Sequence, residues 1–309
     1  MRMEVDVVIP LYNNAAYIIE ALASVLAQTH LPARVFVVDD GSTDDGPALV
    51  EAFIAAHTEG HRVRLARQPN RGPNSARNHG LRLGNSPFVA FLDADDVWHP
   101  CKLEQQLQCF TPGTSGGTVL VHCGAYAVDA ASRTSPLAAS NGAALRGDCF
   151  DRLLLRNTVP GGSSAVLIRR SAFGETGPFD EALLTSEDHD MWLRLARVGA
   201  FDHAPQDLVG LRQHTGNTSK NALRMLQGLV AFDAKWMKHA RTRPDVLRYW
   251  GHLIALFAAR VPEQELAYST IRRGLTATDV RALARRALGS MKLYILLKRL
   301  RATFRPDRA

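Results

Sequence analysis

The apolar run Phe88–Leu92 constrains the fold of this chain most strongly, because it leads directly into Asp93, Asp95 and Asp96. A strand that is covered on both faces reads as a continuous apolar run, and its side chains turn polar where it leaves the sheet. In open α/β sheets ligands bind outside the carboxyl ends of the strands, so these acids are candidates for a functional site. The alternative is a solvated acidic turn before a helix that begins near Pro100.

Crowded carboxylates restrict the chemistry of such a site. They repel one another unless a cation, a donor-rich ligand or protonation relieves them. An Asp-x-Asp pair at a strand end suits a hard divalent ion, which takes oxygen ligands and keeps waters or substrate phosphates in its shell. A single Asp-x-Asp does not decide between a metal site and an acidic turn.

Apolar runs rich in β-branched residues alternate with amphipathic helical patterns through the first hundred residues. The predicted strands are 5–10, 35–38, 63–66 and 88–92. This alternation predicts an α/β fold with a doubly wound, mostly parallel sheet. The second strand also ends in acids, Asp39 and Asp40. Two strands of one sheet that deliver carboxylates to the same edge are hard to explain by structure alone.

Composition is ordinary for a soluble globular protein, with 46% hydrophobic and 22% charged residues in a chain of 309. No apolar run approaches the ~20 residues that span a bilayer, and the N-terminal segment lacks the pattern of a signal peptide. The four cysteines show no C-x-x-C spacing, which predicts reduced thiols in a cytoplasmic protein and no structural zinc.

Basic residues are concentrated near the C-terminus. From 281 to 305 the chain carries eight lysines and arginines and no acid, within a net charge of +7. No recognition motif or aromatic platform accompanies them, so nucleic acid is not the expected partner. Two interpretations remain open: a basic amphipathic helix that binds the inner face of the cell membrane peripherally, or a helix that closes the acceptor side of a site.

Glycine-rich phosphate loops are absent. The first strand is followed neither by G-x-G-x-x-G nor by G-x-x-x-x-G-K-[ST]. A phosphate bound at this sheet would therefore depend on a metal held by the acids and on basic side chains.

Several separated motifs together resemble the inverting family 2 glycosyltransferases of the GT-A fold. The resemblance covers roughly residues 5–219, and the last ninety or so residues match no family-wide motif. The matching segments are Val8–Asn13, Ser24–Thr29, Val37–Asp44, Asn70–Gly72, Ala76–Asn78, Phe91–Asp96, Gly177–Asp180, Glu187–Asp188 with Trp192 and Arg194, and Arg212–His214.

The resemblance implies a GT-A domain over 1–220, with a nucleotide-binding half (1–100) and an acceptor-side half (101–220), followed by a helical region over 221–309. A nucleotide-sugar would bind at the carboxyl edge of the sheet. Pro10, Tyr12 and Asp40, with Asp39 beside it, would hold the base. A carboxylate accepts the N3–H of uracil, so a UDP-sugar is favoured. The alternative for Tyr12 is an aromatic packed in the core.

The remaining nucleotide contacts also follow from the resemblance. Arg77 would approach the nucleotide or its phosphates, or else be a surface arginine. Asp93 would bind the ribose and Asp95 a divalent metal, Mn²⁺ or Mg²⁺, with Asp96 as a support or second ligand. His214 would be a metal ligand or contact the diphosphate, and its alternative is a polar loop histidine.

The resemblance assigns the catalytic base to Asp188. An inverting transfer is a single displacement at the anomeric carbon, so the attacking hydroxyl loses its proton to a positioned base. Glu187 would orient the sugar or Asp188, and Trp192 either packs in the core or lines the acceptor side. The alternative is that acids in a first helical turn simply complement the helix dipole.

The predicted function is transfer of a hexosyl or N-acetylhexosaminyl group from a nucleotide-sugar to a glycan or lipid-linked acceptor, in cell-surface polysaccharide or lipopolysaccharide synthesis. A nucleotidyltransferase would carry a basic loop after the first strand, which this chain lacks. A non-catalytic nucleotide-sugar-binding protein or assembly partner is the other alternative. It has no chemical need for both acidic motifs.

Overall fold

The computed structural model describes residues 3–110, 117–129, 131–136, 144–214, 221–258 and 260. The chain forms two compact units, of which the first holds every residue of the predicted site. Unit 1 comprises Met1–Leu153, Asn157–Glu181 and Glu187–His214, and unit 2 comprises Leu154–Arg156, Ala182–Ser186 and Thr215–Ala309. The predicted domain boundary at 220 and the basic segment 281–305 lie outside the described residues.

Unit 1 is built on one nine-stranded sheet with the order β3-β2-β1-β4-β8-β6-β9-β5, in which β7 pairs with β6. Strands β1 to β4 pair in parallel, and the second half of the sheet mixes parallel and antiparallel pairs. The predicted α/β fold is therefore confirmed. The strands are β1 Val5–Leu11, β2 Arg34–Asp39, β3 Val63–Arg67, β4 Phe88–Phe91, β5 Val97–Trp98, β6 Thr118–Val128, β7 Thr134–Pro136, β8 Val166–Arg169 and β9 Ala200–Arg212.

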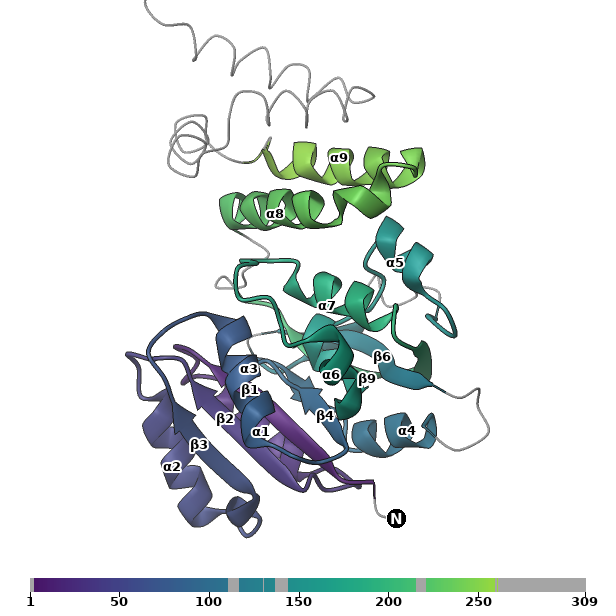
Figure 1. Ribbon diagram of the computed structural model, residues 1–309. Helices are drawn as coiled ribbons and strands as arrows, with labels where there is room; N and C mark the ends of the chain where they lie inside the picture. The colour runs from purple at the N-terminus through teal and green to yellow at the C-terminus, as the bar shows by residue number, and fades with distance from the viewer. Residues whose placement is uncertain are drawn as a thin grey trace, which may run out of the picture. The chain divides into compact units, whose positions relative to one another are not determined.

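Helices flank this sheet, and Figure 1 shows α3 lying across β1 and β2. Gly80 permits this close packing, since a Cβ at that position would collide with the side chain of Val8. The α-helices of the described residues are α1 Ile18–Leu26, α2 Gly46–Ala56, α3 Pro73–Leu83, α4 Lys102–Gln108, α5 Phe150–Leu155, α6 Phe173–Thr176, α7 Glu187–Leu195, α8 Ala222–Ala240 and α9 Pro244–Ala258.

The loop after β1 is tied to the loop after β2 through the side chain of Asn13. Helix α1 begins only at Ile18, and Asn13 has a φ of +51°. Asparagine tolerates this left-handed conformation better than most residues because its short side chain can hydrogen-bond locally. Here the Asn13 side chain accepts hydrogen bonds from the N–H and hydroxyl of Thr43 at 2.8 and 3.2 Å. It ties two loops together instead of capping a helix.

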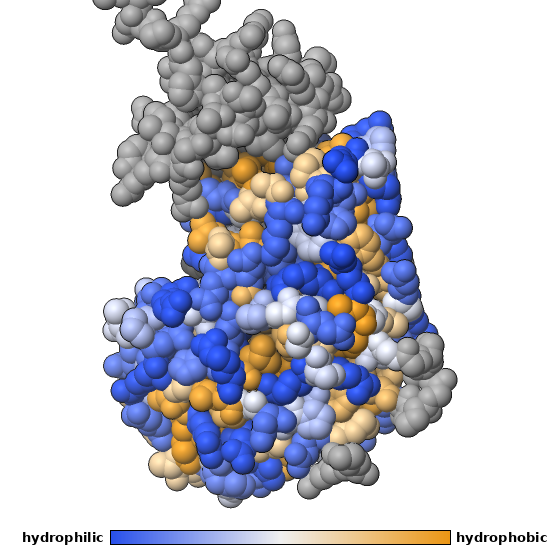
Figure 2. Space-filling view, in the orientation of Figure 1, coloured by the Kyte–Doolittle hydropathy of each residue, from blue (hydrophilic) through white to orange (hydrophobic). Residues whose placement is uncertain are grey.

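The surface of the described residues gives no sign of a membrane span. In Figure 2 the visible face of unit 1 is mainly hydrophilic, with hydrophobic residues in small groups. Among the residues that the structure describes, no helix is both long and apolar enough to cross a bilayer.

Lys102 is an unusual element of the core, because its ammonium group is fully buried without an acidic partner. Its Nζ donates to Gln106 Oε1 at 2.8 Å and lies 4.0 Å from the centre of the Trp98 ring. Burial lowers the pKa of Lys102 from 10.5 to about 8. The folded protein therefore carries an energetic penalty whenever this lysine is charged.

Replacing Lys102 with methionine is expected to raise the free energy of unfolding at pH 7 by about 1–3 kcal/mol, since a flexible apolar side chain of similar length removes the buried charge. The gain should shrink as the pH rises from about 8 toward 10.5, because there the folded lysine is neutral while the unfolded lysine still holds its proton. Urea unfolding at pH 7 and pH 9.5 measures both effects.

The exposed Lys238→Met serves as the matched control. It should change stability by less than about 0.5 kcal/mol at either pH. A Lys102→Met protein that is less stable than the wild type at pH 7 would contradict the prediction.

Candidate functional site

The acids of β2 and β4 meet at one edge of the sheet because both strands pair in parallel with β1 between them. Strand β2 ends at Asp39, opposite Leu11 at the end of β1. The loop after β4 begins at Leu92, whose N–H donates to Val8 O. Tyr12, just past the end of β1, is 47% exposed. The alternative that Tyr12 is a core aromatic is therefore wrong, and its ring is available to a ligand.

The two acids after β2 have different surroundings. Asp40 is buried, and its carboxylate accepts hydrogen bonds from Gln68 Nε2, Arg71 N and Gly72 N at 2.8–2.9 Å. Both of its oxygens thus hold the loop between β3 and α3. The carboxylate of Asp39 accepts one such bond, from Ser42 N at 2.9 Å. Asp39 is accordingly the better placed of the two to accept a base N–H.

Arg77 on α3 links the acid after β4 to the acids that open α7. Its Nη2 donates to Asp93 Oδ1 at 2.7 Å, and its Nη1 lies 3.3 Å from Glu187 Oε1. The arginine is only 4% exposed, whereas the side chain of Asp93 is 40% exposed. Arg77 is therefore no surface arginine. Its predicted contact with the nucleotide stays a prediction, and in this structure its guanidinium positions two carboxylates.

Mutual electrostatics hold this ion-pair network together. Burial by itself lowers the pKa of Arg77, but the carboxylates of Asp93 and Glu187 outweigh that effect and raise it above the ordinary value. Burial raises the pKa of Glu187, while Arg77 lowers it and the neighbouring Asp188 raises it. The guanidinium thus keeps Glu187 closer to ionisation than burial alone would allow.

Two asparagines of α3 anchor the segment that precedes α7. The side-chain amide of Asn78 donates to Phe179 O and accepts from Phe179 N, both at 2.9 Å. The Nδ2 of Asn74 donates to Asp180 O at 3.0 Å. Helix α3, which contains the motif Ala76–Asn78, is therefore hydrogen-bonded to the motif Gly177–Asp180 beside Arg77, although the two motifs are far apart in sequence.

Asp96 and Asp95 differ in their burial: Asp96 is buried, whereas the side chain of Asp95 is 20% exposed. Asp96 is buried, and its carboxylate accepts from Ser164 Oγ at 2.7 Å and from Arg212 N at 3.1 Å. Burial, followed by the charges of Asp95 and Asp93, raises the pKa of Asp96 well above its usual value. Both oxygens of Asp96 are therefore hydrogen-bonded, and its predicted role as a support or second metal ligand stays a prediction.

Asp95 and His214, both predicted metal ligands, pair with one another. Asp95 Oδ2 lies 2.8 Å from His214 Nε2, and their side chains are 20% and 17% exposed. The His214 ring also packs 5.2 Å from the Tyr17 ring. Among the described residues no cluster of three or more acids, histidines or cysteines could enclose an ion. If both bound one ion, they would supply an oxygen and a nitrogen ligand, a set that favours Mn²⁺ over Mg²⁺, with the other ligands from water and phosphate.

Asp188 lies at the start of α7, half-buried beside the network. Its Oδ2 accepts from Asn157 Nδ2 at 3.3 Å and its Oδ1 from His189 N at 2.6 Å. Burial raises the pKa of Asp188, opposed by the bond from His189 N and by the charge of Arg77. A carboxylate with a raised pKa is a stronger base than a solvated one, which suits proton removal near neutral pH.

Sequence reasoning left several site residues without a role. Arg212 is buried, and its Nη2 donates to Glu20 Oε2 at 2.6 Å while its Nε donates to Asp95 O at 2.8 Å. Ser164 and Asn157 hold Asp96 and Asp188. Arg212 stood in a recognised motif and Ser164 at the start of an apolar run that reads as a strand, but nothing in either pattern indicates these contacts. The other open choice, Trp192, is resolved as core, since it is fully buried.

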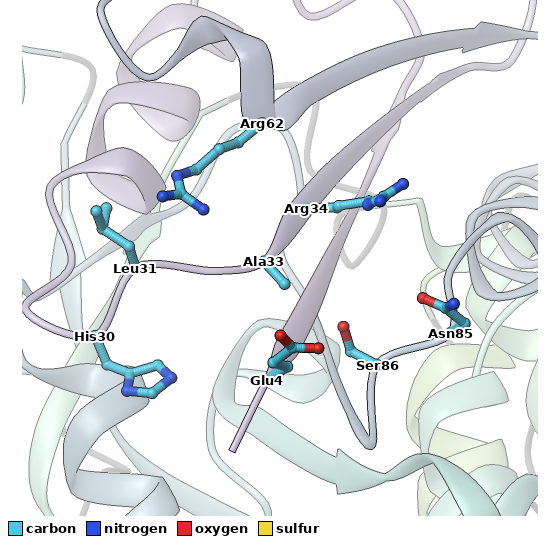
Figure 3. Close-up of a pocket in the computed structure, with 8 residues that line it drawn as sticks. All are labelled: Glu4, His30, Leu31, Ala33, Arg34, Arg62, Asn85 and Ser86. Atoms are coloured by element: carbon cyan, nitrogen blue, oxygen red, sulfur yellow. The ribbon is translucent and has the colours of Figure 1, made fainter. Parts of the chain in front are cut away.

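A pocket of about 350 Å³ lies at the opposite edge of the sheet, near the amino ends of β1, β2 and β4 (Figure 3). Arg34 and Arg62 are among its lining residues, and Arg62 is already paired with Glu59 at 2.6 Å. His30 Nε2 lies 2.9 Å from Met3 O. None of the predicted site residues lines this pocket, so the carboxyl edge remains the candidate site.

Comparison with known proteins identifies the family. A model described as "Glycosyl transferase family 2" matches residues 6–175, more than half of the chain. The chain belongs to glycosyltransferase family 2. The matched region contains β1 to β4 and their acidic strand ends, and the resemblance drawn from the motifs is confirmed.

Relatives agree with this assignment. An "Uncharacterized glycosyltransferase" of Rickettsia typhi is 30% identical over 238 residues, which cover 75% of this chain and 70% of that protein. A chondroitin synthase of Escherichia coli is 31% identical over 70% of this chain. The chain spans only 30% of that synthase, and only 35% of a glycosyltransferase of Rickettsia felis that is 31% identical.

Solved structures share the fold. The S. aureus protein TarS in complex with UDP-GlcNAc aligns over 99% of this chain and 95% of its own, with a TM-score of 0.57 and 20% identity. The mannosyltransferase PcManGT of Pyrobaculum calidifontis, in complex with GDP-Man and Mn²⁺, aligns over 96% of this chain and 86% of its own. Its TM-score is 0.58 at 18% identity. At these identities the likeness shows the fold alone, which is the GT-A fold.

Replacing Arg77 with methionine is expected to destabilise the protein by about 2–3 kcal/mol at pH 7. This is below the 3–5 kcal/mol typical of a broken buried ion pair, because Asp93 stays partly hydrated. The loss should diminish as the pH falls, since the uncompensated Glu187 then takes up a proton. Urea unfolding at pH 5 and pH 7 measures the stability.

The exposed pair Arg67–Glu51 supplies the control. Arg67→Met should cost less than about 1 kcal/mol at both pH values. Equal losses in the two variants would show that the network around Arg77 does not stabilise unit 1.

Proposed function

We propose that this protein is an inverting glycosyltransferase that moves a sugar from a UDP-sugar to a hydroxyl of a glycan or lipid-linked acceptor. One observation carries the proposal: Arg77 holds the strand-end acid Asp93 and the helix-start acids Glu187 and Asp188 in a single network. The network thereby fixes Asp93 and Glu187, which would contact the donor, relative to Asp188, which would take the proton of the acceptor.

The nucleotide is assigned to the edge formed by the loops after β1 and β2. The exposed ring of Tyr12 offers a flat face for the base, beside Pro10 at the end of β1. The carboxylate of Asp39 would accept the N3–H of uracil, since Asp40 is committed to the loop after β3. Asp93, which is partly exposed, would bind the ribose hydroxyls.

A divalent ion would be held by Asp95 and His214 together with the diphosphate of the donor. When bound, it neutralises the charge that develops on the departing diphosphate. Asp96 would act behind it, fixing the loop after β4 through Ser164 and Arg212. The presence of Mn²⁺ with GDP-Man in the solved structure of PcManGT supports the use of a divalent ion.

Asp188 would accept the proton of the attacking hydroxyl as the new glycosidic bond forms and the bond to the diphosphate breaks. We favour a donor that carries a hexosyl or N-acetylhexosaminyl group. We also favour a role in cell-surface polysaccharide synthesis. The similarity to a chondroitin synthase, and to ExoU of Rhizobium meliloti, named a succinoglycan biosynthesis protein, supports the polysaccharide role.

The Asp188→Asn variant tests the base. It should lower kcat about 10²–10⁴-fold, the usual contribution of a general base, while the Kd for UDP stays within about twofold. UDP release from UDP-glucose and UDP-N-acetylglucosamine measures kcat, and calorimetry of UDP binding measures the Kd. The exposed Asp207→Asn is the matched control and should behave as the wild type. Near-normal turnover by Asp188→Asn would overturn the assignment.

The Asp95→Ala variant tests the metal site. Mn²⁺ should strengthen UDP binding to the wild type and leave binding to the variant unchanged, because one protein ligand is lost. Isothermal calorimetry with and without Mn²⁺ makes the comparison, with Asp207→Ala as control. A wild-type affinity for UDP that does not depend on Mn²⁺ would exclude the metal role.

A further inference from the structure

The segment Asn157–Ser164, which we call the glycine–serine loop, contacts both acidic parts of the site. At its start, Asn157 Nδ2 donates to Asp188 Oδ2 at 3.3 Å. At its end, Ser164 Oγ donates to Asp96 Oδ2 at 2.7 Å and accepts from Asp93 N at 3.1 Å. A single short segment therefore spans from the proposed base to the loop of the proposed metal acids.

The amide of Asn157 is itself held in place. Its Oδ1 accepts from Val159 N at 3.1 Å, so the Nδ2 group is fixed toward the carboxylate. Because an amide donates only through its nitrogen, this arrangement defines which end of Asn157 faces Asp188. The side chain is thus set by the loop before any substrate binds.

Gly162 provides a second, steric contact with Asp188. It has a φ of +51°, and a Cβ at this position would lie 3.1 Å from Asp188 Oδ2. Any larger residue would be strained in this backbone conformation and would press on the carboxylate. Glycine therefore leaves the space that Asp188 occupies.

Two hydroxyls of the loop are also unsatisfied. Thr158 Oγ1 and Ser163 Oγ are buried and find no hydrogen-bond partner within the described part of the chain. Unpaired buried hydroxyls are costly, so this loop carries an energetic penalty in the folded protein.

We propose that the glycine–serine loop is a positioning element of the reaction, in which Asn157 and Gly162 fix the direction of the Asp188 carboxylate for proton removal. This inference rests on the proposed function. It adds two positioning residues, Asn157 and Gly162, that act through Asp188. Ser164 of the same loop contacts Asp93 and Asp96, so one segment connects the base with the acids after β4.

The charge environment of Asp188 makes the role measurable. The groups that face it are Arg77 from α3, Asp93 after β4, and its neighbours Glu187 and His189 on α7. The hydrogen bond from Asn157 lowers the pKa of Asp188 against the effect of burial. Loss of that bond should therefore move the acidic limb of the rate–pH profile to higher pH, because the base must be deprotonated to act.

The test compares Asn157→Ala and Asn157→Asp in the full chain. UDP release from UDP-N-acetylglucosamine, with water or acceptor taking the sugar, is followed from pH 5 to 9. We expect the acidic limb to shift upward by less than about one pH unit in Asn157→Ala, and by about 1–3 units in Asn157→Asp, where two carboxylates adjoin. The Kd for UDP should stay within about twofold. Asn85→Asp, an exposed change at the opposite edge, should leave the profile unmoved.

A glycine pair tests the steric contact. Gly162→Ala should lower kcat at least tenfold, whereas Gly147→Ala should not, although Gly147 also has a positive φ of +69°. A Cβ at Gly147 meets no atom within 4 Å, so this control isolates backbone strain from contact with Asp188.

The outcomes separate the two proposals. Rates that fall equally at all pH values in both Asn157 variants, with no shift of the limb, would mean a merely structural role and would overturn this inference. No UDP release by the wild type from any UDP-sugar would instead overturn the proposed function.

Discussion

The buried guanidinium of Arg77 is the constraint on which the site depends. A charge that has left water is tolerated only where opposite charges surround it, and here Asp93 and Glu187 supply them. One carboxylate follows β4 and the other opens α7, so their common partner joins the two halves of unit 1. The close packing of α3 on β1, permitted by Gly80, brings Arg77 to this position.

The acids of the site fall into two groups with different work. Asp40 and Asp96 are buried and have both oxygens engaged by loops, so they shape the edge of the sheet. Asp188 also has both oxygens engaged, by His189 N and Asn157 Nδ2. In each strand-end pair the other member has fewer bonds: Asp39 accepts one hydrogen bond, from Ser42 N, and Asp95 pairs with His214.

Local sequence patterns were sufficient to find most of these acids. Where they left a residue's surroundings open, the reason is physical. The strand-end acids were recognised because each follows an apolar run, and the Glu187–Asp188 pair because it resembles a family motif at a helix start. For Arg77 a nucleotide contact and a surface position were both left open, since a charged residue on a short helix gives no sign that it will be buried. Tyr12 and Trp192 were left open because an aromatic residue alone does not reveal its burial. The structure exposes the first and buries the second.

By itself the sequence determined the α/β class, the acids at the ends of β2 and β4, and the family, because these depend on local periodicity and on motifs of fixed spacing. Only the tertiary structure decided how each acid of a pair is hydrogen-bonded, that Arg77 is a buried partner of two acids, and that Asn157 and Ser164 reach Asp188 and Asp96. Those properties depend on contacts between residues far apart in the sequence, 110 positions for Arg77 and Glu187 and 119 for Asp95 and His214. Burial and hydrogen bonding at that range follow from the packing of the sheet and its helices and leave no periodic trace in the chain.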